Sequence, residues 1–130
     1  MPLEEGDVEQ LLIDYLTTAL PANGFTVPVA DQMVAPECVV LYRVGGADRD
    51  QVTGFPSVIL EAYAATNTRA SQILRRVFAL VRDLYGRQLG AFMVYDVQVF
   101  RGPSSDPKPP ADLVRYSAMV AVAVRMNQTV

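Results

Sequence analysis

The chain has 130 residues, of which 51% are hydrophobic and 19% charged, with a net charge of −3, one cysteine and no histidine. The length and composition predict one globular domain that needs no disulfide or thiolate metal cluster. The absence of histidine excludes Ser-His and Cys-His nucleophilic catalysis and histidine-ligated zinc, and the acidic balance argues against general duplex DNA binding. The acidic N-terminus and the absence of an apolar run near ~20 residues indicate a cytoplasmic protein with no membrane partner.

The first expected element is a helix over residues 7–20. Asp7 and Gln10 have the spacing of a capping box, and apolar residues then recur at the i, i+3, i+4 spacing of one buried helix face. Residues 25–36 alternate like a strand but contain Pro28. Because proline is confined to edge strands and bulges, this segment predicts an edge strand or an extended arm.

Four stronger strand patterns and a second helix follow. We expect strands over 38–44, 57–65, 92–101 and 113–126, a helix over 68–85, and projecting loops over 45–56 and 102–112. The pattern predicts a single α+β domain over residues 1–130, in the order α-(β)-β-β-α-β-β. Its four- to five-stranded sheet is mainly antiparallel and has both helices on one face.

The second face of this sheet is informative because two helices, each about 10 Å wide, cover one face only. Alternation places polar residues there, namely Arg43, Glu61, Asp96, Gln98, Arg115, Ser117 and Arg125, and apolar ones, namely Ile59, Tyr63, Phe92, Val94, Phe100, Met119, Ala121 and Ala123. An apolar surface of this extent, interrupted by charges, predicts a contact with another protein or a second copy. The alternative is that residues 25–36 fold over it. Arginine at Ile59 or Met119 is expected to weaken assembly.

Other candidate contact residues lie in the loops and on the second helix. They are Gly45, Gly46, Asp48, Arg49, Asp50 and the apolar anchor Phe55 in the first loop, Pro107 and Lys108 in the second, and Arg75, Arg76 and Arg82 on the helix. The loops fit either solvated connections or projecting contacts, and the helix arginines fit either a solvated face or the binding of an acidic protein surface. Cys38 is expected to be buried. No motif predicts an enzyme, a cofactor or a metal site.

Several stretches together carry a family resemblance. They are VEQLLIDYL at residues 8–16, VLYRVGG at 40–46, PSVILEAYAAT at 56–66 with the helix after it, and Gly102-Pro103 with Arg115-Tyr116 around the proline-rich loop. Over residues 8–126 the chain resembles the tail terminator proteins of long-tailed, siphovirus-type bacteriophages, especially those of actinobacteria.

This resemblance implies an α+β protein that forms a hexameric ring on the head-proximal end of the tail tube, stops tube polymerisation and offers a surface for head joining. The implied partners are further copies of the chain, the tail tube protein, a head-completion or connector protein and a tape-measure protein, with DNA passing through the lumen without specific binding. The implied location is the neck of the virion, and the host cytoplasm during assembly. The alternatives are another neck or tail-completion protein, or a regulatory domain that binds a small molecule.

Overall fold

The computed structural model describes residues 5–48, 53–106 and 113–126. Its elements, in chain order, are α1 (Glu5–Ala22), β1 (Val29–Ala30), β2 (Cys38–Asp48), β3 (Thr53–Ala64), α2 (Asn67–Arg82), β4 (Gln88–Leu89), β5 (Phe92–Asp106) and β6 (Val114–Met126). The α+β class is confirmed. The sheet has six strands rather than four or five, because β1 and β4 are two residues long and too short to show a period.

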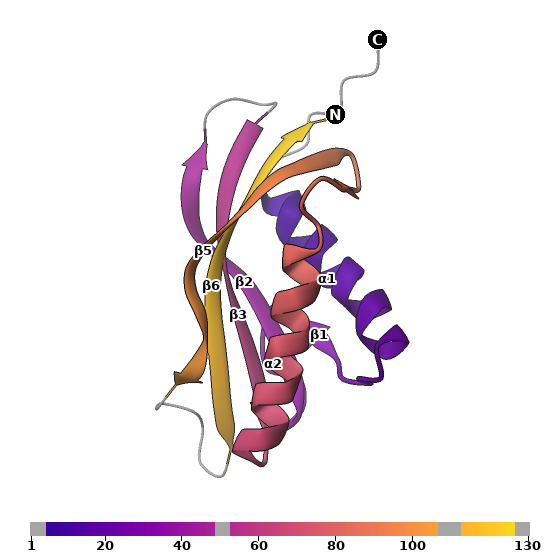
Figure 1. Ribbon diagram of the computed structural model, residues 1–130, viewed down its shortest axis with the longest axis vertical. Helices are drawn as coiled ribbons and strands as arrows, with labels where there is room; N and C mark the ends of the chain where they lie inside the picture. The colour runs from indigo at the N-terminus through magenta and orange to yellow at the C-terminus, as the bar shows by residue number, and fades with distance from the viewer. Residues whose placement is uncertain (1–4, 49–52, 107–112, 127–130) are drawn as a thin grey trace.

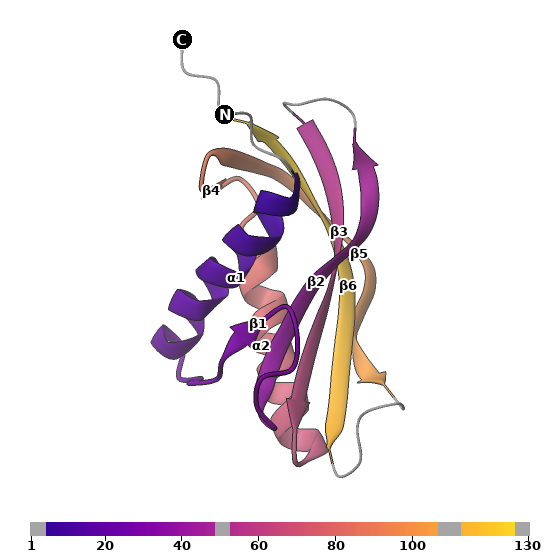
Figure 2. The ribbon, with the colours of Figure 1, turned by 180° about the vertical axis from the view of Figure 1, so that it is seen from behind.

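The strands form one sheet in the order β1-β2-β3-β6-β5-β4. All neighbours pair antiparallel except β1 and β2, which pair parallel at the edge. Both helices lie on the same face, with α2 next to the sheet centre and α1 beside β1 and β2 (Figures 1 and 2). The sheet is strongly twisted, and β5 crosses the line of β6 along its length (Figure 1).

The helix limits follow from their capping residues. The Thr66 hydroxyl accepts a hydrogen bond from the Arg69 backbone N–H at 3.2 Å and starts α2. Helix α1 extends past both predicted limits: it begins by Glu5, so Asp7 lies inside the helix and is not its N-cap, and it includes Pro21 in its last turn. There the Asn23 N–H turns to the Leu20 carbonyl at 2.9 Å, a tighter spacing than in an α-helix, and Gly24 ends the element at a φ of 89°.

A single apolar core fills the space between the helices and the sheet. The alternating positions of β3 and β6 that were expected to face the helices do so, and fully buried members include Val58, Leu60, Val120 and Val122. Cys38 is buried, as expected, but on the other face, where it packs with Val40 and Tyr63.

Strand β5 departs from the predicted alternation. Phe92 and Val94 were expected on the face away from the helices, yet both are buried in the helix-side core. The pairing of β5 with β6 shifts register between Val94 and Asp96, and Val97 then packs against the same core. A bulge adds one residue to a strand, so the side chains before it and after it alternate in opposite phase. A single alternating pattern applied to the whole of β5 therefore assigns the residues on one side of the bulge to the wrong face.

The strands around the two predicted loops are longer than the sequence pattern indicated. Gly45 and Gly46 belong to β2 and Phe55 to β3, paired as Gly45↔Ser57, Gly46↔Pro56 and Ala47↔Phe55. Strand β5 likewise continues through Gly102-Pro103 to Asp106. A neighbouring strand supplies hydrogen-bond partners to residues of low strand propensity, and proline is tolerated on an edge. The candidate contact residues Arg49, Asp50, Pro107 and Lys108 lie outside the described residues.

Candidate protein-contact surface

The face of the sheet turned away from α1 and α2 is here called the open face. Its central apolar pair is Ile59 of β3 and Met119 of β6, which are direct cross-strand partners and partly exposed. Directly opposed side chains of neighbouring strands lie about 5 Å apart, so the two form one contiguous apolar patch. Figure 1 shows that neither helix reaches this face. The patch is therefore available to another protein.

The alternative cover, residues 25–36, reaches only one end of the open face. Ala35 packs against the small cluster of Cys38, Val40 and Tyr63. Val27, in contrast, is buried in the helix-side core, and Val29 and Ala30 form the edge strand β1. Residues 25–36 therefore do both things that the sequence suggested: they provide an edge strand, and they cover part of the open face.

Next to the apolar patch lies a polar cluster centred on the Glu61 carboxylate, which is 7% exposed. The Tyr63 hydroxyl donates to Oε1 at 3.0 Å and the Tyr42 hydroxyl to Oε2 at 3.3 Å. Arg115 Nη1 lies 3.8 Å from Oε2 and donates to the Tyr63 hydroxyl oxygen at 3.3 Å. The cluster therefore ties β2, β3 and β6 together through side chains.

Three predicted site residues, Glu61, Tyr63 and Arg115, thus come together. The fourth member, Tyr42, was missed, although the alternation Val40-Leu41-Tyr42 places it on the face of Val40. The alternation of the strand could therefore have placed Tyr42 on this face. The sequence does not show the strand register, which puts Tyr42 within reach of Glu61.

Burial raises the pKa of Tyr63 and of Tyr42 above that of a free tyrosine. The neighbouring Glu61 carboxylate raises both further, while Arg115 acts in the opposite direction. The two hydroxyls therefore remain neutral hydrogen-bond donors across the physiological range. The chemistry of the cluster is that of a structural anchor that satisfies a buried carboxylate.

These raised pKa values set the sign of one pH dependence. The folded state favours the neutral tyrosine. Its contribution to the free energy of unfolding is therefore complete below the unfolded-state pKa of about 10 and is lost as pH rises through the folded-state pKa. Tyr63→Phe is expected to make the alkaline decline in unfolding free energy shallower and to cost about 1 kcal/mol at pH 7 through the lost hydrogen bond. Urea unfolding at pH values from neutral to about 11 measures both.

The matched control is Tyr85→Phe, since Tyr85 is 65% exposed. It should leave both the alkaline slope and the neutral stability unchanged. Equal slopes for the Tyr63 variant and the parent chain would contradict the assignment. The slope should not vanish, because burial also raises the pKa of Tyr15 and Tyr42.

Another arginine near the open face is held in place by hydrogen bonds. Arg101 of β5 donates from Nη1 to the Ser117 hydroxyl at 2.7 Å and to the Ser117 carbonyl at 3.2 Å, with Ser104 Oγ also at 3.2 Å. Arg125 lies over the Tyr95 ring at 5.6 Å. Side chains ordered in this way lose less conformational entropy when a partner covers them. The polar residues of this region are therefore compatible with a protein contact.

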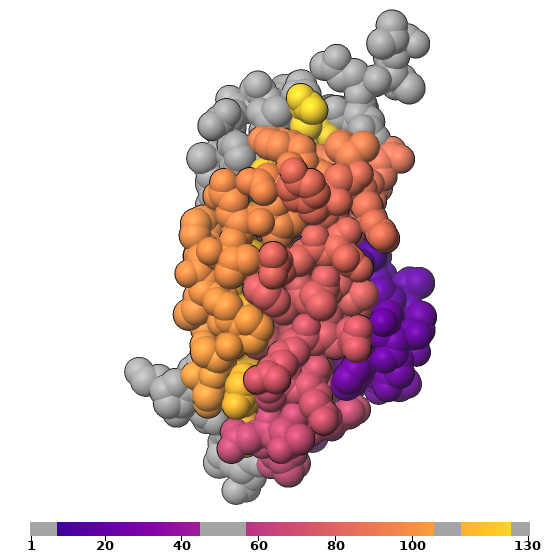
Figure 3. Space-filling view, viewed as in Figure 1, coloured from indigo at the N-terminus to yellow at the C-terminus, as the bar shows by residue number. Residues whose placement is uncertain are grey.

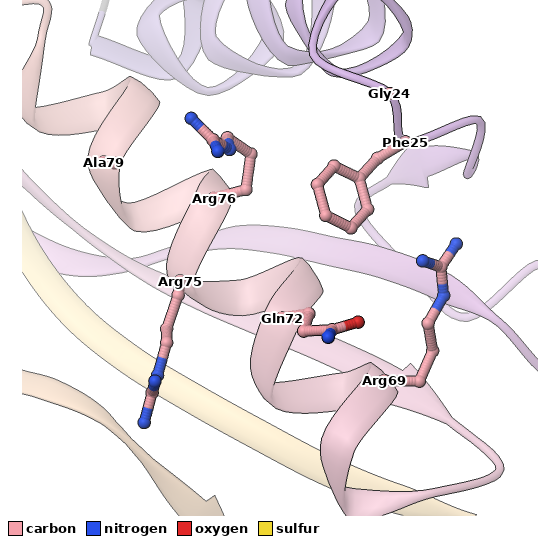
Figure 4. A pocket seen from close by; sticks show the side chains of 7 residues that line it. All are labelled: Gly24, Phe25, Arg69, Gln72, Arg75, Arg76 and Ala79. Atoms are coloured by element: carbon pink, nitrogen blue, oxygen red, sulfur yellow. The ribbon is translucent and has the colours of Figure 1, made fainter.

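The predicted arginines of α2 do not converge on one point. Arg76 lines an open depression of about 560 Å³, together with Gly24, Phe25, Arg69, Gln72, Arg75 and Ala79 (Figure 4). In this view Arg75 points away from Phe25, and Arg82 lies over the Phe78 ring at 5.7 Å. Arg69 is engaged by Glu37 at 3.0 Å and by the Phe25 ring at 5.2 Å.

This depression is wide open to solvent and does not enclose a ligand. It therefore lacks the enclosed form of a small-molecule site. Within residues 5–48, 53–106 and 113–126, no group of three histidine, cysteine or acidic side chains is placed to hold a metal ion. None of the helices in these ranges is long and apolar enough to cross a membrane.

Comparisons with known proteins identify a fold but no family. No protein-family model matches the sequence, and no curated protein is significantly similar to it. The structure does match a chain in a solved structure described as the virion of a native gene transfer agent particle, with a TM-score of 0.59 and 18% sequence identity. The match covers 95% of each chain. The two chains therefore share a fold over nearly their whole length.

Proposed function

We propose that this chain is a non-enzymatic structural protein of a phage-like virion, and that its place there is that of the tail terminator. The observation that carries the proposal is the fold shared over 95% of both chains with a component of a gene transfer agent virion. The open face supports it independently, because a helix-free sheet face with a central apolar patch fits a protein contact. The sequence resemblance to tail terminators supplies the finer assignment.

A ring that caps a tube needs at least three contact surfaces on each subunit. Two different surfaces make the head-to-tail contacts with the neighbouring copies, and a third binds the tube. We assign the open face, with Ile59 and Met119 at its centre, to the tail tube protein. A further surface then serves the head-completion or connector protein, and the tape-measure protein is an additional candidate on the tube side.

The test is whether the chain forms rings and shortens tubes. Light scattering at two concentrations should show a species of about six times 14.2 kDa, and negative-stain images should show rings. Added to polymerising tube subunits, the protein should bind tube ends and give shorter tubes. A compact dimer at all concentrations would contradict the proposal, as would unchanged tube length.

A second assignment within the virion is another neck or tail-completion protein. It shares the supporting fold match and differs in where the protein binds. Binding to head-completion or connector proteins with no effect on tube length would favour it over the terminator. The same tube assay therefore separates the two assignments.

A further inference from the structure

The sheet has two partly open edges. At one side β1 pairs only Val29 and Ala30 with β2, and at the other β4 pairs only Gln88 and Leu89 with β5. Within the described residues, β2 beyond Val40 and β5 beyond Val94 are therefore the outermost strands. Open edges invite pairing with another chain, and natural proteins usually protect them.

Each edge strand carries a bulge that presents an apolar side chain. In β2 the register shifts between Arg43 and Gly45, which leaves Val44 without a cross-strand partner and 45% exposed. In β5 the register shifts between Val99 and Arg101, which likewise leaves Phe100 without a cross-strand partner and 58% exposed. Bulges re-aim side chains at sheet edges, and large apolar residues are usually kept off such positions.

The two bulges lie on either side of one row of paired residues, close to the same level of the sheet. Along one row of cross-strand partners, Arg43 pairs with Val58, Val58 with Val120, and Val120 with Val99. Val44 follows one end of this row and Phe100 the other, and because β2 and β5 run in opposite directions the two residues lie on opposite sides of the row, about one residue apart along the strands. Copies that join these edges therefore need only a small shift along the strands, and such head-to-tail contacts form a ring where the rotation between copies closes.

Charge is divided unevenly along the sequence. Residues 1–50 contain nine carboxylates and two arginines, whereas residues 51–130 contain nine basic side chains and five carboxylates. The first group supplies α1, β1 and β2, and the second supplies α2, β4 and β5. Figure 3 shows α1 and β5 at opposite margins, with α2 between them. The margin of α1 and β2 is therefore acidic, whereas many arginines of the second group lie on α2 between the two margins, and β5 itself carries Asp96, Arg101 and Asp106.

We propose that neighbouring subunits of the ring meet edge to edge, with Phe100 on β5 of one copy packed against Val44 on β2 of the next. The inference rests on the proposed ring and names its contact. Next to Val44, the Glu9 carboxylate accepts the Arg43 N–H at 2.9 Å, and at the earlier bulge of β5, on the N-terminal side of Phe100, the Asp96 carboxylate accepts the Val97 N–H at 2.9 Å. Since these backbone donors are occupied, side chains rather than an uninterrupted strand ladder make the contact.

Disulfide trapping tests this contact. In a Cys38→Ala background, Val44→Cys with Phe100→Cys is expected to give an oxidation ladder of covalent oligomers up to the ring, while either single cysteine gives none. The two positions lie on strands three spacings apart, about 14 Å, and a disulfide requires Cα atoms within about 7 Å. A ladder therefore reports contacts between copies.

The matched control pairs Phe100→Cys with Val34→Cys, because Val34 is 55% exposed but lies outside β2. It should give no ladder. A second variant, Phe100→Glu, should shift the solution mass from ring to monomer.

The assays are run with and without tube subunits, so that a ring that closes only on the tube is also examined. Rings or capped tubes without a ladder in the double cysteine variant, or with an unchanged mass for Phe100→Glu, would overturn the edge contact and leave the terminator function standing. Absence of both rings and tube capping in the parent chain would instead overturn the proposed function, and the edge contact with it.

Discussion

Replacing Arg115 with methionine is expected to lower the free energy of unfolding by about 3 kcal/mol, the lower end of the range for breaking a buried ion pair. The change leaves the Glu61 carboxylate, 7% exposed, with two tyrosine hydroxyls and without its nearby cation. We choose the lower end because the charged atoms are 3.8 Å apart and the Arg115 side chain is 17% exposed. Urea denaturation measures the difference, and the melting temperature should fall by roughly 10 °C.

Two further variants show whether the loss comes from the isolated carboxylate. Arg125→Met removes an exposed arginine of the same strand together with its contact to the Tyr95 ring and should cost no more than about 1 kcal/mol. Adding Glu61→Gln to Arg115→Met removes the unpaired charge and should restore part of the stability. If Arg115→Met were no more destabilising than Arg125→Met, the cluster would not be the anchor of β2, β3 and β6 described above.

Placing arginine at both Ile59 and Met119 is expected to abolish tube capping while leaving the monomer folded. Both side chains are partly exposed in the isolated chain, so an arginine can lie along the sheet and keep its guanidinium in water. Beneath a docked partner the same guanidinium would be buried without a counter-ion. We expect binding to tube ends to weaken at least about tenfold, since a contact at an interface centre is often worth 2 kcal/mol or more.

Tube length in the presence of the variant measures this loss, and circular dichroism with urea unfolding checks the fold. Gln72→Arg is the matched control, because it adds the same side chain at an exposed position on the helix side. It should cap tubes like the parent chain. Normal capping by the double arginine variant would show that the open face does not bind the tube. Loss of capping with intact rings would separate the open face from the subunit edges.

Local sequence signals predicted several elements well. The helix predicted over 68–85 is observed as α2 at Asn67–Arg82, with Ile73, Leu74 and Val77 buried against the sheet. Strands β3 and β6 alternate regularly through their paired centres, so their helix-facing residues could be assigned directly. These features depend on neighbours a few residues away, which a single sequence contains.

The sequence predicted which residues belong to the candidate site better than it predicted which of them touch. Glu61, Tyr63 and Arg115 were assigned to the correct face, but the carboxylate meets the hydroxyls of Tyr42 and Tyr63 only through the register of three strands. The Ile59–Met119 pair depends on the same register. Residues far apart in the chain set these distances, so strand alternation places side chains on a face without showing which of them touch.

By itself, the sequence determined the α+β class, the main helices and strands, the regular core faces of β3 and β6, and the division of charge between residues 1–50 and 51–130. The tertiary structure decided where β2 and β5 bulge, that Phe92 and Val94 turn inward, and that Val44 and Phe100 flank the same row of paired residues at opposite edges. The physical reason is that helix and strand periods arise from local backbone geometry, whereas bulges and register are set by pairing with strands distant in sequence.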